Sequence, residues 1–384
     1  MSTSRCLLLM GIVVLAPPLA AQQPGYVMNE APRLPAARAW RVGPVLMQAG
    51  HAEDPNGLEL SRVVGAARMP DGRVVIGNAG ANELVVVDAS GRPIARAGRG
   101  GEGPGEFRSL SRIGITAEGE IWAADRTQRL VHYFGSAAEF SRTVSLRSFT
   151  TPGGLHPAGM MADGRLVLYS AAIPLGGPAA DFDSTDIVVL DPRAGQSTTI
   201  ARVPQTDAGD PLGSKLFGAP LILAVGATEI WRGFGDQYRI HRMDGTGRSR
   251  GGLDKRQPAV ALTASVWTRY LDARAAASRA AGRSAEELRQ MRQRLEATTR
   301  PSQLPFYSEA TVDLTGNLWV RGFEVPDVIT PDWDVFDAAG NWVTTLPLPE
   351  RFRPMQIGAD WILGVQRDED GVESVALRRL IKPD

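Results

Sequence analysis

Hydrophobic and polar positions alternate along this chain in short segments, and a turn residue precedes each segment, a pattern that is typical of β-strands. The unit is a glycine or threonine followed by a strand that often contains tryptophan. Its six copies are residues 72–75, 119–122, 164–167, 228–231, 316–319 and 358–361. Successive turn positions lie 47, 45, 64, 88 and 42 residues apart, and the two long intervals contain visible insertions. The shorter intervals match the period of a four-stranded propeller blade, about 40–50 residues.

Every copy except the last is followed by a second strand that ends near a turn. These second strands are residues 84–88, 130–134, 187–191, 238–244 and 333–337. Several copies continue through another turn into an outer strand, as at 93–97 and 342–346. This succession predicts antiparallel meanders, and six of them predict an all-β fold, the six-bladed β-propeller.

The two ends of the chain are complementary. Residues 39–63 resemble the outer strand and connector at 92–113, although no blade precedes them. The last segment, 353–381, supplies about three strands and lacks a fourth. We therefore expect the N-terminal strand to complete the last blade, which would close the ring and remove its exposed edges.

Residues 263–300 interrupt the β pattern with a stretch rich in alanine and arginine. Thr263 is suited to cap a first helix, and Gly282 is suited to end it. Ser284 and Glu287 form the capping box of a second helix. The segment predicts an inserted α-helical hairpin with eight arginines and four acidic residues. Its basic surface is either a solvated outer face, or a lid over the central funnel or a docking surface for an acidic partner.

The N-terminus resembles a signal peptide. Arg5 precedes an apolar run at 6–16, and small residues follow as far as Ala21, after which we expect cleavage. An uncleaved anchor is the alternative, but the apolar run is much shorter than the ~20 residues that span a bilayer. Residues 1–21 are thus the predicted signal peptide and residues 22–384 the propeller. The mature chain is expected in the periplasm or outside the cell, without a transmembrane segment.

Composition excludes some classes of function. The single cysteine, Cys6, is removed with the signal peptide, which leaves no disulfide and no thiolate metal site. The 42 basic residues balance the 42 acidic residues. Such a neutral chain gives no electrostatic reason to expect nucleic acid as a partner.

Residues 98–134 resemble an NHL repeat. The resemblance rests on a Gly-rich connector that ends in Phe107, on Ile121 and Trp122 after Gly119, and on Asp125. Residues 305–380 are similar to exported bacterial six-bladed propeller proteins, most of which have no assigned function. The resemblance implies the fold and no particular activity, because a fold alone does not confer chemistry.

Two motifs that could suggest ligand binding have structural explanations. Residues 98–103 match G-x-G-x-x-G, but a dinucleotide site requires a helix to follow, and here Pro104 and Gly105 lead into another β unit. The acidic segment 181–186 lacks the glycine and terminal glutamate of a calcium loop and is interpreted as a solvated insertion.

The remaining residues provide no catalytic or metal signature. The four histidines, His51, His132, His156 and His241, are isolated, and we expect packing or surface roles for them. His132 and His241 alternate with apolar residues in second strands, which places them away from the axis. No catalytic residue, metal ligand or cofactor is therefore assigned.

The repeat register predicts which side chains reach the funnel. Seven residues before each turn position lie Gly65, Arg112, Pro157, Leu221, Glu309 and Arg351. The charged members, Arg112, Glu309 and Arg351, are the candidate ligand-binding residues, because arginines at the funnel mouth can hold an anionic group through bidentate contacts. The alternative is that they are solvated charges at strand ends.

Two functions remain open. The first is a non-catalytic, exported binding or scaffolding module for a protein, peptide or glycan, since a complete ring carries no catalytic signature. The second is a metal-dependent hydrolase that resembles the gluconolactonase group of six-bladed propellers, to which Glu309 and Asn78 would contribute metal ligands.

Overall fold

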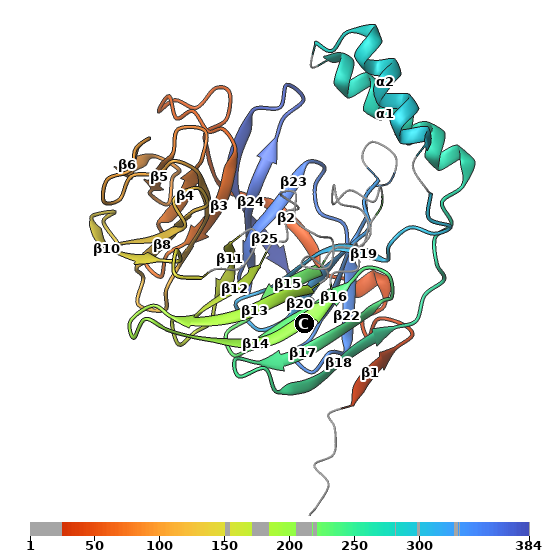
Figure 1. Cartoon of the computed structure of the whole chain (residues 1–384), viewed down its shortest axis with the longest axis horizontal. Coiled ribbons are helices and arrows are strands. Elements are labelled where there is room, and N and C mark those ends of the chain that lie inside the picture. Colours follow the sequence, from red (N-terminus) through yellow and green to blue (C-terminus); the bar gives the residue numbers. More distant parts are fainter. Residues whose placement is uncertain are drawn as a thin grey trace, which may run out of the picture.

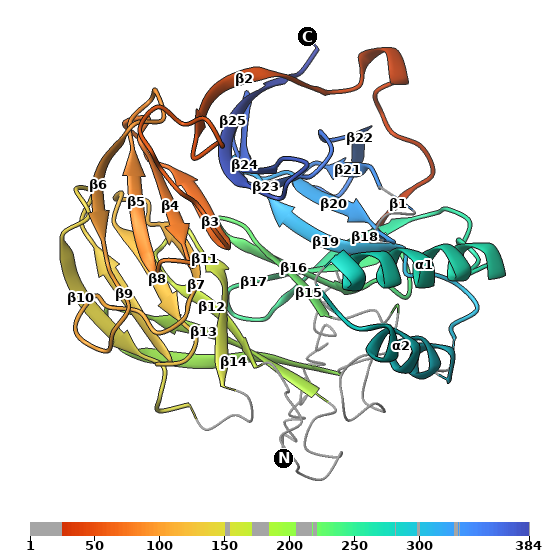
Figure 2. The same ribbon diagram turned by 90° about the horizontal axis from the view of Figure 1, so that it is seen from above.

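The computed structural model describes residues 25–149, 154–170, 184–204, 217, 221–280, 282–297, 300–325, 329 and 331–383. The predicted signal peptide and residues 181–183 of the acidic insertion lie outside this part of the chain. The described strands form six radially arranged sheets, so the predicted six-bladed β-propeller is confirmed (Figures 1 and 2).

The first three blades follow one another along the chain as simple meanders. Blade 1 consists of β3 (Val63–Arg68), β4 (Val74–Asn78), β5 (Glu83–Val87) and β6 (Pro93–Ala97). Blade 2 consists of β7 (Leu110–Ile115), β8 (Ile121–Asp125), β9 (Leu130–Phe134) and β10 (Phe140–Ser145). Blade 3 consists of β11 (Leu155–Met160), β12 (Leu166–Ser170), β13 (Ser184–Asp191) and β14 (Gln196–Pro204).

Blades 4 and 5 continue the series, and blade 6 combines both ends of the chain. Blade 4 consists of β15 (Leu221–Val225), β16 (Glu229–Phe234), β17 (Arg239–Asp244) and β18 (Ser249–Lys255). Blade 5 consists of β19 (Tyr307–Val312), β20 (Leu318–Gly322), β21 (Trp333–Phe336) and β22 (Trp342–Leu346). Blade 6 consists of β23 (Phe352–Ile357), β24 (Trp361–Arg367), β25 (Glu373–Ile381) and β2 (Arg41–Ala49).

The apolar residues of the second and third strands form cores between neighbouring blades. In β4 all five residues are buried, because a blade is covered by another blade on each face. Trp231 belongs to the core between blades 4 and 5, and Trp319 to the core between blades 5 and 6. These tryptophans of the repeat therefore pack between adjacent blades and do not line the channel.

The expected closure of the ring is confirmed. β2 pairs antiparallel with β25, with Gln48 opposite Ala376, so the N-terminal strand supplies the missing outer strand of blade 6. The sequence did not predict β1 (Tyr26–Asn29), which adds to the outer edge of blade 4 in parallel with β18. A short 3-10 helix, Ala36–Arg38, lies between β1 and β2.

The predicted helical hairpin is also confirmed. Its helices are α1 (Ala264–Ala280) and α2 (Ala285–Ala297), inserted between blades 4 and 5. Thr263 caps α1 through a bond from the Val266 amide to its hydroxyl (3.3 Å). Ser284 and Glu287 make the expected reciprocal capping box, with distances of 2.8 and 3.3 Å.

The loops that carry the candidate site gather at one face of the ring. Connectors from each outer strand to the next inner strand share this face with the loops between second and third strands, because consecutive strands run antiparallel. We call it the connector face. Figures 1 and 2 show α1 and α2 projecting at one side of the ring, away from blades 1 and 2. No helix among the described residues is long and apolar enough to cross a bilayer.

Candidate functional site

The inner strands can be aligned by counting opposing residue pairs from the turn that ends each of them. The hairpins after these strands are closed by backbone bonds that begin, for example, at Met69, Thr116 and Asp313. The fourth pair from each closing bond lies near the connector face. The inner-strand members of this fourth pair are Gly65, Arg112, His156, Ile222, Glu309 and Arg353.

This alignment keeps Arg112 and Glu309 but replaces Arg351 by Arg353. Arg351 precedes β23, has a positive φ of 57°, and donates through Nη1 to the carbonyl of Asp368 at 3.0 Å. The predicted register was wrong at this position because Gly358 itself closes its hairpin, through a 2.9 Å bond to the Trp361 carbonyl. A bulge between Pro354 and Gln356 shifts the register once more.

Arg112 and Arg353 are held in the same way. Arg112 Nη1 donates to the carbonyl of Pro157 in blade 3 (3.2 Å), and Arg353 Nη2 donates to the carbonyl of Val63 in blade 1 (2.9 Å). Each arginine thus leaves the inner strand of its own blade and bonds to the inner strand of the next. Within the described part of the chain, neither guanidinium has a salt bridge to a carboxylate.

Arg112 shares an electrostatic environment with charges from two other blades. Solvent reaches part of its side chain, but the surrounding protein displaces water from the guanidinium, and this desolvation lowers its pKa. Tyr169 and Glu309 oppose this shift, and Arg353 adds to it. The guanidinium still stays charged at neutral pH, because arginine is protonated throughout the range in which proteins are stable.

Glu309 is the acidic member of the group. Its side chain is 37% exposed, and its Oε2 lies 3.9 Å from Nη1 of Arg321. Burial raises the pKa of this carboxyl, and Glu324 adds to the rise, while Arg321, Arg353 and Arg112 lower it. The Glu309 carboxylate therefore lies in the electrostatic field of guanidinium groups from three blades, those of Arg321, Arg353 and Arg112, without a close ion pair to any of them.

Glu309 and Arg353 line a hollow of about 740 Å³ at the connector face, which we call the mouth pocket. Arg112 does not line this pocket, but its charge acts on Glu309 and Arg353. One wall comes from β19 and β20, and the other from residues 348–354 and 365–371 of blade 6. Its charged lining residues are Glu309, Arg321, Glu324, Glu350, Arg351, Arg353, Arg367, Asp368 and Glu369. Arg351 thus lies on the rim of the pocket although it is off the register of the other candidates.

A second hollow of about 920 Å³ adjoins the mouth pocket. The two share Arg367 and Gly371. The connector before β3, residues 50–62, and residues 370–373 of blade 6 line most of the second hollow. The side chain of Arg367 is fixed by Glu373 at 2.6 Å, and Glu373 in turn accepts the Val63 amide at 2.7 Å. Arg367, which both hollows share, is therefore held in place by a carboxylate that is itself bonded to β3.

The two residues proposed for metal binding lie on different blades, Asn78 on β4 of blade 1 and Glu309 on β19 of blade 5. Asn78 is buried in blade 1, where it accepts the Ser61 amide (3.0 Å) and donates to the Glu59 carbonyl (3.1 Å). It therefore fixes a connector and is not available beside Glu309. Among the described residues, no group of three or more His, Cys, Asp or Glu is arranged to hold a metal ion.

The structure places His51 in a loop, His132 and His241 in the strands that the sequence predicted for them, and His156 at a position near the axis that the sequence did not predict. His132 and His241 lie in β9 and β17, away from the axis as predicted. These strands, the second ones of the sequence repeat, are the third strands of their blades because an inner strand precedes the repeat unit. Burial lowers the pKa of both histidines. His156, in contrast, lies on an inner strand at the same register as Arg112 and Glu309. The bulge in β11 hid this match from residue counting.

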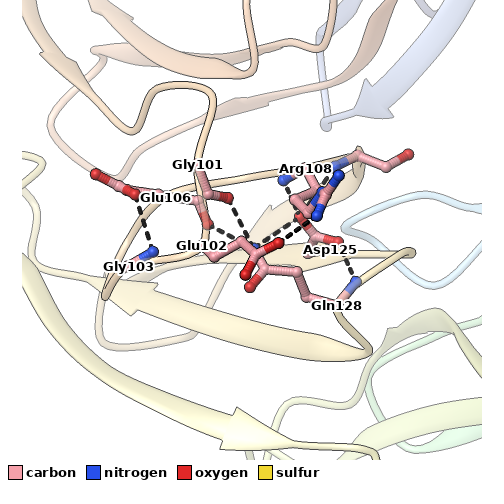
Figure 3. Close-up of polar contacts among 8 residues, drawn as sticks. Gly101, Glu102, Gly103, Glu106, Arg108, Asp125 and Gln128 are labelled. Carbon is pink, nitrogen blue, oxygen red and sulfur yellow. Dashed lines mark hydrogen bonds and ion pairs between the residues drawn. The ribbon is translucent and has the colours of Figure 1, made fainter.

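The Gly-rich connector is held by the blade that follows it (Figure 3). The buried carboxylate of Asp125 accepts the amides of Arg108 (2.6 Å) and Gln128 (2.6 Å). The Gln128 amide group donates to the carbonyls of Gly101 (3.2 Å) and Glu106 (3.1 Å). The glycines lead directly into β7, and no helix follows them in residues 98–149. The connector is thus structural, in agreement with the interpretation of its sequence.

Comparisons with known proteins identify the fold and no family. No protein-family model matches the chain, and no curated protein matches it, so the NHL resemblance stays a prediction. A Bacteroides fragilis protein provisionally described as exported is 13% identical, with a TM-score of 0.53 over 93% of this chain and 99% of its own. A DUF4221 member from Bacteroides vulgatus is 11% identical, with a TM-score of 0.55 over 90% of this chain and 99% of its own.

A gluconolactonase from Xanthomonas campestris is also similar in topology. It is 11% identical, and the match covers 90% of this chain and 98% of that protein, with a TM-score of 0.46. At these identities the likeness concerns the ring of blades and carries no activity across.

Proposed function

We propose that this chain is an exported binding module that anchors its ligand through an anionic group at the funnel mouth. The observation that supports it is the pair Arg112 and Arg353. Both guanidiniums are fixed by a carbonyl of the next blade, and neither has a salt bridge within the described residues. An anion site requires a cation that is held in place and has no carboxylate partner of its own.

The physical case rests on the donors that remain. A guanidinium carries five N–H donors in a planar fork, and each of these arginines is shown using one of them on a carbonyl. The fork suits a carboxylate, because two parallel N–H bonds can form at once. Since the carbonyls already hold the side chains, ligand binding costs less side-chain entropy than it would for free arginines.

The class of ligand follows from the charged walls of the mouth pocket and from the predicted export of the chain. An extracytoplasmic protein, peptide or glycan that presents a carboxylate fits a mouth pocket with charged walls, and the signal-like residues 1–21 support export. The alternative of a metal-dependent hydrolase keeps Glu309 as its only candidate ligand, since Asn78 is bonded to a connector. The binding module is therefore the better supported proposal.

The test is calorimetry on the mature chain, residues 22–384. The probes are pentapeptides with a free C-terminal carboxylate and the same peptides as amides. We expect the carboxylate forms to bind, and the variant Arg112→Gln with Arg353→Gln to bind them at least about tenfold more weakly, because a charged hydrogen bond contributes about 1.5–3 kcal/mol.

The matched control is Arg248→Gln. Arg248 is exposed in the turn between β17 and β18, at the face of the ring opposite to the connector face, and its loss should leave binding unchanged. Equal binding of amide and carboxylate peptides would refute the proposal. Calcium-dependent hydrolysis of a lactone that disappears in Glu309→Gln would support the hydrolase instead.

A further inference from the structure

The segment that links β20 to the next loop has two sides with different partners. Phe323 and Val325 belong to the apolar cluster that Trp267, Tyr270 and Leu271 of α1 form at the connector face. Val325 is fully buried, and its amide bonds to the carbonyl of Ile329 at 3.2 Å. The ring of Phe217 lies against both Tyr270 (5.0 Å between ring centres) and Phe323 (6.0 Å), so the helical hairpin and this segment share one apolar cluster.

Glu324 lies between these two residues and has a different environment. It lines the mouth pocket, and its Oε2 accepts from Nη1 of Arg321 at 2.8 Å. Side chains alternate along an extended segment, so Phe323 and Val325 can both face the apolar cluster while Glu324 faces the mouth pocket on the other side. The carboxylate is 38% exposed and acts on Glu309, whose pKa it raises.

The two helices of the hairpin contact each other and the cluster through basic side chains. Arg292 of α2 bonds to Asp272 of α1 (3.2 Å) and to Glu296 (3.0 Å), which ties the two helices together. The guanidinium of Arg300 lies 4.4 Å from the centre of the Trp267 ring. The apolar side of α1 thus belongs to the same cluster as Phe323 and Val325, and Arg300 covers Trp267 at the edge of that cluster.

We propose that the hairpin positions Glu324 in the mouth pocket and thereby sets the ligand charge that the site accepts. This inference rests on the proposed function. Glu324 neutralises Arg321 and places a negative charge beside Glu309 and the anion site. The mouth therefore accepts a singly charged carboxylate and disfavours a polyanion, because each additional ligand charge meets the same two carboxylates.

The variants Tyr270→Ala and Phe323→Ala each remove a ring contact with Phe217, one from the helical hairpin and one from the 323–325 segment. At least one of them tests the idea if the other folds poorly. Arg289→Ala is the matched control, since Arg289 lies on the exposed face of α2 with 67% of its side chain exposed. Glu324→Gln removes the charge itself. All variants are made in the full mature chain.

The first measurement is hydrogen exchange of the peptide that contains Gly322 and Val325, whose amides bond to Asp332 and Ile329. We expect faster exchange in Tyr270→Ala and Phe323→Ala and unchanged exchange in Arg289→Ala. This result does not depend on any ligand. Unchanged exchange in both core variants would overturn the positioning role even if carboxylate peptides bind as proposed.

The second measurement is the affinity for inorganic pyrophosphate relative to a carboxylate pentapeptide. Glu324→Gln should raise the relative affinity for pyrophosphate about fivefold, and Tyr270→Ala should do the same, because either change removes the carboxylate from the mouth. The double variant should gain no more than the single ones, since both act through one residue. Additive gains would overturn the inference, whereas binding of neither probe by the wild type would overturn the proposed function alone.

Discussion

The boundary between blades 4 and 5 and the funnel mouth both contain charged side chains inside the ring, but they use them differently. At the boundary, Nζ of Lys255 lies 2.6 Å from Oδ2 of Asp334, and both side chains are less than a tenth exposed. Tyr238 and Thr345 each donate a hydroxyl to Asp334 at 2.6 Å. Lys255 also lies 3.8 Å from the centre of the Trp342 ring.

At the funnel mouth, Arg321 is paired with Glu324, but Arg112, Arg353 and Glu309 have no such close ionic partner among the described residues. Arg112 and Arg353 are each bonded to a carbonyl, and the Glu309 carboxylate is 3.9 Å from its nearest cation among the salt bridges. The protein thus pairs the buried charges of Lys255 and Asp334 with each other at the boundary between blades 4 and 5, whereas Arg112 and Arg353 keep N–H donors at the mouth that no bond within the described residues uses. The comparison teaches that the boundary network serves the fold, whereas the mouth has capacity left for a ligand.

The largest expected effect is on the boundary network. Lys255→Met or Asp334→Ala should lower the free energy of unfolding by about 3–5 kcal/mol, because each leaves a buried charge without its partner. Burial already lowers the pKa of Lys255, so the loss of Asp334 would favour its neutral form. Urea unfolding of the purified variants measures this, and Arg239→Gln, in the exposed pair with Asp254, is the control with a loss below about 1 kcal/mol. A boundary variant as stable as the control would remove the contrast.

The next effect concerns the connector that leads into blade 2. Asp125→Ala should cost about 2–4 kcal/mol of unfolding free energy, since several buried donors lose their acceptor, among them the amides of Arg108 and Gln128. Asp125→Asn keeps the shape and one acceptor oxygen, and should cost less. Urea midpoints compare the two, and an equal loss in both variants would indicate that charge alone matters.

A smaller effect is the pH dependence of anion binding. The pKa of Glu309 is raised mainly by burial, so its carboxyl takes up a proton above the usual range as the pH falls. Protonation removes a negative charge beside Arg112 and Arg353, and the affinity for an anion should rise several-fold as the pH falls through that pKa. Glu309→Gln should bind with the low-pH affinity at neutral pH and lose this dependence.

The probe for this titration should be a peptide that ends in a sulfonate, which stays charged across the range. The sign for stability is the same: a carboxyl with a raised pKa in the folded state favours folding at low pH, and this contribution is lost as the pH rises through the folded-state pKa. An affinity that falls on acidification would contradict the placement of Glu309 beside the anion site.

The smallest effect should come from Arg351→Gln. Arg351 lies on the rim and bonds to the Asp368 carbonyl, so we expect less than about 0.5 kcal/mol of change in unfolding free energy. Peptide affinity should also change little compared with Arg353→Gln. Calorimetry compares the two variants, and a larger loss of affinity in Arg351→Gln would restore the register that the sequence predicted.

The features that the sequence predicted correctly are those that short motifs or the regular repeat encode. The blade period, the closure by β2 and the caps at Thr263 and Ser284 depend on residues near one another or on a simple repeat. β1 was missed because four residues added to a free edge leave no repeat signal; the pairing depends on β18.

The candidate site was predicted in part for a similar reason. Arg112 and Glu309 follow from residue counting where the inner strands have no bulge between the turn and the fourth pair. Arg353 and His156 lie beyond bulges in β23 and β11, which counting cannot see. Glu324 depends on packing against the hairpin, a tertiary contact that leaves no sequence motif.

The central claim is that the mouth arginines serve a ligand and the boundary network serves the fold. The most direct measurement is the urea midpoint of the wild type and of Arg112→Gln with Arg353→Gln, each with and without a saturating carboxylate pentapeptide. We predict similar midpoints without peptide, and an increase with peptide in the wild type alone, about 2.7 kcal/mol at a hundred times the Kd. A variant that is strongly destabilised without peptide, or stabilised by it as much as the wild type, would contradict the account.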